Sequence, residues 1–171
     1  MGDTLRTMAE TPERTLIEML ALQPGERVLD AGCGLGRWTA ALASTGVHVT
    51  GIDIQAPLLE QARIACPGAE LQAADLLKWI PPEPFDAIFA FATLHWVHPP
   101  QDAARALYKL LKPGGRLGVA FGGLSDNAKE LAGCYRPEPE EYAGVLKKAG
   151  FAILEVRRSE RHFLLLAGRG K

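Results

Sequence analysis

Apolar residues in this chain fall into short continuous runs that alternate with longer stretches in which they recur every three or four positions. Continuous runs are typical of buried strands, and the longer period is typical of helices with one apolar face. The expected strands span residues 27–31, 47–52, 69–72, 85–91, 116–121, 151–157 and 162–167. The expected helices span residues 37–44, 57–65, 101–111 and 138–149, and a further helix starts at Pro12 and ends before Pro24.

These strands and helices together predict the fold class. Strands that are apolar throughout, rather than alternating, belong to a parallel sheet covered by helices on both faces. Residues 158–161 alone separate the last two expected strands, which is too short for the crossover that parallel neighbours need. At least one of the two must therefore be antiparallel to its neighbour. The sequence predicts an α/β, Rossmann-like, doubly wound sheet that is mostly parallel, in a three-layer αβα arrangement.

Length and composition limit the domain organisation. A chain of 171 residues is long enough for one domain with a substantial core and short for two, so we expect a single domain over residues 1–171, with residues 1–10 flexible. The composition, 47% hydrophobic and 23% charged, argues against a disordered chain. No apolar run is long enough for a signal peptide or a membrane span, which predicts a cytoplasmic protein without a membrane partner. Three widely spaced cysteines predict reduced thiols.

Charge is unevenly distributed, although the net charge is only −1. Acidic residues exceed basic ones over residues 1–85, and the reverse holds over residues 86–171, above all after Ala143. A basic part of this kind can attract an anionic partner, so nucleic acid stays open as a partner. A solvated basic surface is the more common explanation.

The stretch VLDAGCGLG places three glycines directly after a predicted strand. Gly32, Gly34 and Gly36 permit tight turns and let a ligand approach the backbone, at the strand end where open parallel sheets bind ligands. A dinucleotide fingerprint has the spacing GxGxxG, but here Arg37 stands where the third glycine would be. Asp30, before the loop, would repel a diphosphate and attract an ammonium group. The loop therefore favours a zwitterionic ligand.

Acidic residues also end the next two predicted strands. Asp53, in GIDI, is placed to accept hydrogen bonds from both hydroxyls of a ribose, and Ile54 offers an apolar face to a base. Asp75, in AADL, is placed to accept from the exocyclic amine of adenine. A single aspartate at a strand end can simply cap a helix or start a turn. Acids at three successive strand ends together favour a ligand that contains a nucleoside.

The segments VLDAGCGLG, GIDI, AADL, FDAIFAFATLHWV and LLKPGGRL, at matching spacing, resemble the class I S-adenosylmethionine-dependent methyltransferases. The resemblance covers about residues 12–168. The phrase over residues 93–96 is similar to the subset that methylates small carboxylic acids, such as the trans-aconitate and malonyl-carrier methyltransferases. The resemblance implies a seven-stranded sheet with an antiparallel C-terminal strand. It also implies S-adenosylmethionine as cofactor and S-adenosylhomocysteine as product.

The resemblance further implies a set of cofactor residues in the glycine loop and at the strand ends. They are Asp30, Gly32, Cys33, Gly34, Gly36, Asp53, Ile54, Asp75, Leu76 and Phe91. Asp30 and the loop backbone would lie near the methionine moiety, and Asp53 would bind the ribose. Ile54 would lie against the adenine ring, and Asp75 with Leu76 at its edge.

Phe91 and Ala92 would border the methionine end of the cofactor. Many relatives place Asn or Asp where Phe91 stands, some in an NPPY motif that holds an amine, so Phe91 argues against amine methylation of that type. The expected reaction is in-line displacement of the methyl group by an oxygen of a small carboxylic acid or another small metabolite. A carboxylate acceptor needs no general base.

His95 is the candidate catalytic residue. It follows the predicted strand 85–91, where the methyl group would point, and its pKa suits proton transfer near neutral pH. A histidine at this place can instead line the pocket or hydrogen-bond a loop. His95, His98 and Asp102 imitate a metal cluster, but no ligand scaffold is evident, so no metal is expected.

Residues 122–137 form a short connection where relatives carry helices that cover the acceptor site. We expect an open site, suited to a large acceptor on a macromolecule, to closure by a second subunit, or to a chain that has lost activity. A small-molecule acceptor is nevertheless the leading expectation. Two other functions stay open: a cofactor-binding or scaffolding domain without turnover, and a nicotinamide-dependent oxidoreductase, which Arg37 and Asp30 disfavour.

Overall fold

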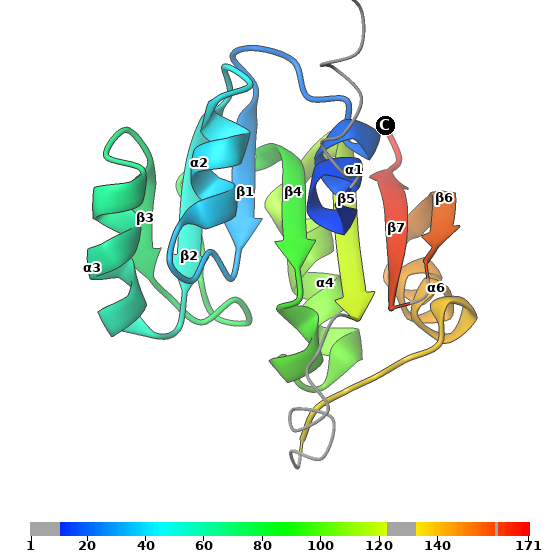
Figure 1. Cartoon of the computed structure of the whole chain (residues 1–171). Coiled ribbons are helices and arrows are strands. Elements are labelled where there is room, and N and C mark those ends of the chain that lie inside the picture. Colours follow the sequence, from blue (N-terminus) through cyan, green and yellow to red (C-terminus); the bar gives the residue numbers. More distant parts are fainter. Residues whose placement is uncertain (1–10, 123–132, 160) are drawn as a thin grey trace, which may run out of the picture.

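The computed structural model of the chain describes residues 11–122, 133–159 and 161–171. Seven strands form one sheet in the order β3-β2-β1-β4-β5-β7-β6 (Figure 1). Their bounds are β1 Arg27–Ala31, β2 His48–Asp53, β3 Glu70–Ala73, β4 Phe85–Phe91, β5 Leu111–Gly122, β6 Phe151–Arg158 and β7 His162–Arg169.

Strand direction follows the predicted pattern. The strands from β3 to β5 pair in parallel, whereas β7 is antiparallel to both of its neighbours, β5 and β6. A short turn joins β6 to β7, and the backbone N–H of Ser159 donates to the carbonyl of His162 across it at 2.8 Å. The predicted fold class, with an antiparallel C-terminal strand, is confirmed.

Helices cover both faces of the sheet and make three layers. The helix bounds are α1 Pro12–Met19, α2 Arg37–Ala43, α3 Ala56–Ala65, α4 Pro100–Leu110 and α6 Pro139–Lys148, and a 3-10 turn, η1, spans Leu94–Trp96. In Figure 1, α1, α2 and α3 lie in front of the sheet and α4 and α6 behind it. Within the described residues, no helix has the length and apolar character needed to cross a bilayer.

Local chemistry explains where these elements begin. The Thr11 hydroxyl accepts from the backbone N–H of Arg14 at 3.4 Å, and Pro12 occupies the first turn of α1, where its missing N–H costs nothing. The strand β5 starts earlier than the expected residue 116, because Leu111 already pairs with Phe85. The register then shifts before the regular pairing resumes, which accommodates the Pro-Gly-Gly sequence that we expected to lie outside the strand.

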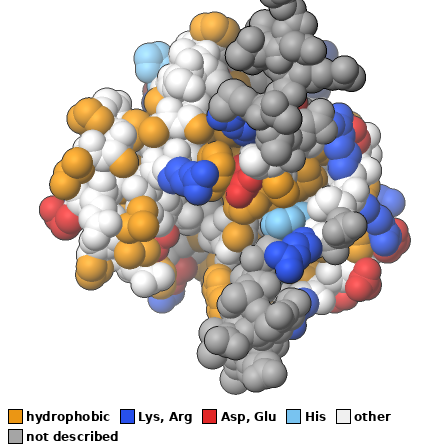
Figure 2. Space-filling view, in the orientation of Figure 1, with side chains coloured by type: hydrophobic (Ala, Val, Ile, Leu, Met, Phe, Trp, Pro, Cys, Tyr) orange, Lys and Arg blue, Asp and Glu red, His pale blue; other side chains and the backbone are white. Residues whose placement is uncertain are grey.

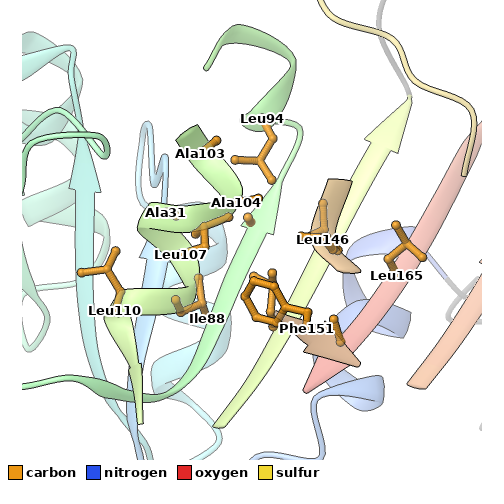
Figure 3. Packing of buried hydrophobic residues seen from close by; sticks show 14 of the residues in the cluster. Ala31, Ile88, Leu94, Ala103, Ala104, Leu107, Leu110, Leu146, Phe151 and Leu165 are labelled. Carbon is orange, nitrogen blue, oxygen red and sulfur yellow. The ribbon is translucent and has the colours of Figure 1, made fainter. Parts of the chain in front are cut away.

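The sheet separates the two largest clusters of the hydrophobic core. Behind it, Ala103, Ala104 and Leu107 of α4 pack on Ile88 of β4, with Leu146 of α6 in the same cluster (Figure 3). In front of it, a second cluster joins residues of α1 and α2 to the opposite face of the strands; its largest members include Leu16, Leu20, Leu42, Phe89 and Leu164. The two clusters fix the central strands, and therefore their carboxyl ends, in one rigid edge.

Register brings the carboxyl ends of β1, β2 and β4 together. Ala31 pairs with Ile52 of β2, and Asp30 pairs with Phe89 of β4. The segments that leave these three strands therefore start side by side, as expected for the ligand-binding edge of an open α/β sheet.

We expect Leu107→Ala to lower the free energy of unfolding by about 2–5 kcal/mol, because truncating a fully buried leucine leaves a cavity. Urea denaturation provides the measurement. Ile64→Ala on α3 is the control, since Ile64 is 83% exposed and its truncation should change stability by less than about 0.5 kcal/mol. Equal effects of the two substitutions would contradict the assigned core.

Candidate functional site

The glycine loop, residues 32–36, has a backbone that side chains would not permit. Gly32 has φ +80°, and a Cβ on it would lie 2.2 Å from the Thr93 hydroxyl oxygen. Gly36 has φ +81°, and a Cβ there would lie 2.9 Å from the Cα of Ala62. Glycine is therefore required twice, first so that the loop can reach the segment after β4 and then so that α2 can approach α3.

Asp53 holds the glycine loop in place. One of its carboxylate oxygens accepts from the backbone N–H of Gly34 at 2.9 Å, and the other accepts from the N–H of Gln55 at 2.9 Å. The backbone N–H groups of Gly32 and Cys33 both donate to the carbonyl of Ile52, at 2.8 and 3.0 Å. The carboxylate is thus oriented before any ligand arrives, and it keeps acceptor capacity on both oxygens.

A pocket of about 530 Å³ opens at this edge of the sheet. It is lined by Gly32, Ile52, Asp53, Ile54, Gln55, Ala74, Asp75, Leu76, Leu77, Phe91, Ala92, Thr93, Trp96, Val97 and His98. Six of the predicted cofactor residues belong to this lining: Gly32, Asp53, Ile54, Asp75, Leu76 and Phe91. Thr93, Trp96 and His98 also line the pocket but were not expected as cofactor residues. All three lie in or beside residues 93–96, which are similar to the methyltransferases that act on small carboxylic acids.

Four predicted cofactor residues are not part of the pocket lining: Asp30, Cys33, Gly34 and Gly36. Asp30 is 2% exposed, and its carboxylate accepts from the hydroxyl of Thr39 on α2 at 2.7 Å. Burial raises the pKa of Asp30 to about 7. Cys33 is buried against Leu59 and Ala62, and burial raises the pKa of its thiol to about 12, so it stays protonated. Of the glycine loop, Gly32 alone therefore belongs to the pocket lining.

Asp75 organises the turn that follows β3. Its carboxylate accepts from the backbone N–H of Leu77 at 3.0 Å and lies 3.5 Å from the Lys78 ammonium. Leu76 is buried beside it, whereas Ile54, across the pocket, is 72% exposed. The exposed face of Ile54 is an apolar surface available to a planar ring.

His95 is buried, and both of its ring nitrogens are engaged by backbone. Its Nδ1 lies 2.9 Å from the carbonyl of Tyr135 and its Nε2 lies 3.2 Å from the N–H of Gly122, so the ring is the neutral tautomer with the proton on Nδ1. The ring also packs edge-on against Phe121, with centroids 4.8 Å apart. Burial lowers the pKa of His95. This geometry favours the alternative that the sequence left open, a histidine that hydrogen-bonds a loop, over a general base.

His95, His98 and Asp102, whose spacing in the sequence is similar to that of metal ligands, are each engaged by another group. His95 is held by backbone, His98 hydrogen-bonds the carbonyl of Gly133, and Asp102 pairs with Arg105. In the part of the chain that the structure describes, no group of three or more His, Cys, Asp or Glu residues is arranged to hold a metal ion. The expected short connection over the acceptor site falls largely on residues 123–132, outside the described residues.

The comparisons with known proteins agree with this arrangement. A family model described as "Methyltransferase domain" matches residues 28–115, just over half of the chain. Together with relatives at more than 30% identity over most of the chain, the match shows that the protein belongs to the class I S-adenosylmethionine-dependent methyltransferases. The family resemblance predicted from the sequence motifs is confirmed.

Particular relatives refine this placement. The trans-aconitate 2-methyltransferase of Paracidovorax citrulli (strain AAC00-1) is 37% identical over 123 residues, which are 70% of this chain and 46% of the relative. The S-adenosyl-L-methionine-dependent Diels-Alderase iccD of Talaromyces variabilis is 31% identical in an alignment 173 positions long, which covers 85% of this chain and 59% of the relative. The chain thus spans about half the length of the curated relatives it matches.

A solved structure shares the fold. The N-methyltransferase NodS from Bradyrhizobium japonicum WM9 in complex with S-adenosyl-l-homocysteine superimposes with a TM-score of 0.78 at 20% identity, covering 99% of this chain and 94% of that one. At this identity the likeness shows the fold alone.

The raised pKa of Asp30 predicts a pH effect on stability. A carboxyl group whose folded pKa of about 7 exceeds its unfolded value of about 4 stabilises the fold at low pH, and this stabilisation is lost as pH rises through that interval. Asp30→Asn cannot ionise, so we expect it to gain stability relative to the wild type between about pH 4 and pH 7. Urea denaturation at a series of pH values measures the difference. Asp102→Asn, at a partly exposed position of α4, is the control for removing a carboxyl group. An Asp30→Asn difference that does not change with pH would refute the buried carboxyl.

The two backbone contacts of His95 predict a structural effect. His95→Ala should lower the free energy of unfolding by about 1–3 kcal/mol, because it removes the hydrogen-bond partner of a partly buried carbonyl and of a partly buried N–H. The lowered pKa of His95 means that the wild type also loses stability as pH falls below about 6.5, which the variant should not share. His48→Ala, at an exposed site, is the control for denaturation. Full stability of His95→Ala would restore the case for a catalytic role.

Proposed function

We propose that this chain binds S-adenosylmethionine in the pocket at the carboxyl ends of β1, β2 and β4 and directs its methyl group to an oxygen of a small carboxylic acid. The observation that carries the proposal is the Asp53 carboxylate, which two backbone N–H groups hold in a pocket that Gly32 of the glycine loop also lines. A carboxylate so fixed can accept both ribose hydroxyls of a nucleoside without reorganising.

The other pocket residues suit the remaining parts of this cofactor. The exposed face of Ile54 fits one side of the adenine ring, and Asp75 with Leu76 fits its edge. Gly32 and Phe91 lie at the opposite part of the lining and suit the methionine end. Asp30 is buried against Thr39 of α2, where an approaching ammonium group would favour its ionised form. The backbone N–H groups of Cys33 and Gly34 donate to Ile52 and Asp53 and so hold the loop, which ends at Gly36, beside the pocket.

The bound cofactor would supply an electrophilic sulfonium methyl group, so the task of the protein is to position the acceptor in line with it and to exclude water. Phe91 lines the pocket at the place where amine-methylating relatives carry Asn or Asp, and it offers no hydrogen-bond acceptor to an amine. A carboxylate oxygen needs no base, which agrees with a His95 ring whose two nitrogens are already engaged. The likeness to trans-aconitate 2-methyltransferases supports the same acceptor class.

A second candidate is a domain that binds S-adenosylmethionine without transferring its methyl group. One relative, 31% identical, is named an S-adenosyl-L-methionine-dependent Diels-Alderase, so the family includes a protein whose named reaction is not methylation. Methyl transfer to any member of an acid panel separates the two functions. The nicotinamide-dependent oxidoreductase stays disfavoured, because Arg37 replaces the glycine of the dinucleotide fingerprint and the buried Asp30 would repel a diphosphate.

Ligand-dependent stability tests the cofactor. S-adenosylhomocysteine at about a hundred times its Kd should raise the free energy of unfolding by about 2.7 kcal/mol, and NAD should leave it unchanged. Asp53→Asn should weaken S-adenosylhomocysteine binding by about tenfold or more, because hydrogen bonds to a charged group contribute about 1.5–3 kcal/mol. Isothermal calorimetry measures the affinity.

Asp102→Asn on α4 is the matched control and should bind S-adenosylhomocysteine as the wild type does. Stabilisation by NAD alone, or unchanged affinity in Asp53→Asn, would overturn the cofactor assignment. Methyl transfer is followed separately with a cofactor labelled in its methyl group and a panel of carboxylic acids.

A further inference from the structure

Three rings from three separate elements form a continuous wall next to the pocket. Phe91 of β4 lies between Trp38 of α2, at a centroid distance of 6.3 Å, and His162 of β7, at 6.0 Å. All three side chains are partly exposed. Phe91 also lines the proposed cofactor pocket, so the wall begins where that pocket ends. Hydrophobic, acidic and histidine side chains adjoin in the middle of this face (Figure 2).

Strand register explains why His162 reaches this place. Phe91 pairs with Ala120 of β5, which pairs with Leu164 of β7, and Leu164 belongs to the front core cluster with Phe89. His162 lies two residues before Leu164 and therefore points to the same face of the sheet. Its partner in the register is Gly122, which has no side chain to fill the space between them.

The imidazole of His162 is chemically available, unlike that of His95. Among the residues that the structure describes, neither ring nitrogen of His162 makes a hydrogen bond, whereas both nitrogens of His95 do. Burial lowers the pKa of His162, so near neutral pH the ring is neutral and carries one N–H donor and one acceptor. A polar group of this kind at the edge of an aromatic wall can orient a ligand.

We propose that Trp38, Phe91 and His162 form the acceptor subsite of the proposed methyltransferase, and that it takes a planar, unsaturated carboxylic acid. The flat body of the acid lies against the Trp38 and Phe91 rings, and an imidazole N–H of His162 donates to its carboxylate. The inference rests on the proposed function, because the wall adjoins the pocket assigned there to the cofactor.

Charged side chains near His162 and Trp38 determine how the carboxylate of the acid is oriented in the subsite. Glu13 of α1 and Arg161, beside His162, act on the imidazole with opposite sign, since Glu13 raises its pKa and Arg161 lowers it. The Arg37 guanidinium stacks on the outer ring of the wall, 4.7 Å from the Trp38 centroid. An anionic carboxylate is therefore favoured on the side of Arg161 and disfavoured on the side of Glu13.

Methyl transfer to an acid bound in this subsite needs no reactant besides the acid and the cofactor. A carboxylate oxygen lone pair forms the new O–C bond to the methyl carbon as the C–S bond breaks, and that electron pair goes to sulfur. No proton moves, so His162 acts as a hydrogen-bond donor that holds the acceptor and not as a base.

The test uses the intact chain saturated with S-adenosylhomocysteine, which measures acceptor binding without turnover. The probes are trans-aconitate and cinnamate, with their saturated counterparts tricarballylate and hydrocinnamate. Binding is followed by calorimetry and by the nitrogen shifts of the His162 imidazole in NMR spectra. We expect the unsaturated acids to bind more tightly than their counterparts and to shift the His162 resonances.

Substitutions separate the donor from the aromatic wall. His162→Phe keeps a ring beside Phe91 but removes the donor, and we expect it to weaken binding of the unsaturated acids by about tenfold or more. His162→Gln, which retains an N–H donor, should recover part of that loss. Glu13→Gln should strengthen acid binding and Arg161→Gln should weaken it. His48→Phe, at the opposite end of β2, should change nothing.

The inference is overturned when S-adenosylhomocysteine binds but no acid shifts the His162 resonances, or when His162→Phe binds the acids as the wild type does. Failure of S-adenosylhomocysteine to bind at all would instead refute the proposed function. Normal binding of S-adenosylhomocysteine to His162→Phe shows that this variant is folded.

Discussion

The close approach of the glycine loop to the segment after β4 is the constraint on which the site depends. A side chain at Gly32 would overlap Thr93, so the loop turns tightly over the end of the sheet. The same turn brings the N–H of Gly34 to the Asp53 carboxylate and leaves the pocket between β1, β2 and β4. A wider loop would lose this hydrogen bond and fill the pocket, because the strands themselves are fixed by the core on both faces.

Two buried ionisable groups lie on either side of this edge, and each supports it differently. Asp30 connects β1 to α2 through Thr39, at the cost of burying a carboxyl group whose pKa is raised. His95 connects the turn after β4 to β5 and to Tyr135, using both ring nitrogens. These groups hold the backbone around the pocket, while the two carboxylates that line it, Asp53 and Asp75, keep acceptor capacity.

In the proposed arrangement, the nucleoside end of the cofactor binds over β2 and β3, and the acceptor binds beside β4 and β7. Phe91 belongs to both regions. It lines the cofactor pocket, and its ring also lies beside the rings of Trp38 and His162. An antiparallel β7 matters for this arrangement. Because β7 is reversed, its first residue, and not its last, lies at the ligand-binding edge, and that residue is His162.

The sequence by itself determined the layered sheet, the reversed final strand and two of the strand-end acids that line the pocket, Asp53 and Asp75, because apolar runs, turn lengths and strand-end acids are local signals. It did not determine the function of either histidine. His95 looked like a base beside the reacting group, but Tyr135 and Gly122, 40 and 27 residues away, engage its ring. Nothing in the sequence around His162 indicated a binding role, because its neighbours Trp38 and Phe91 belong to other elements. Hydrogen-bond partners and ring contacts between distant segments depend on strand register and helix packing, which only the tertiary structure decided.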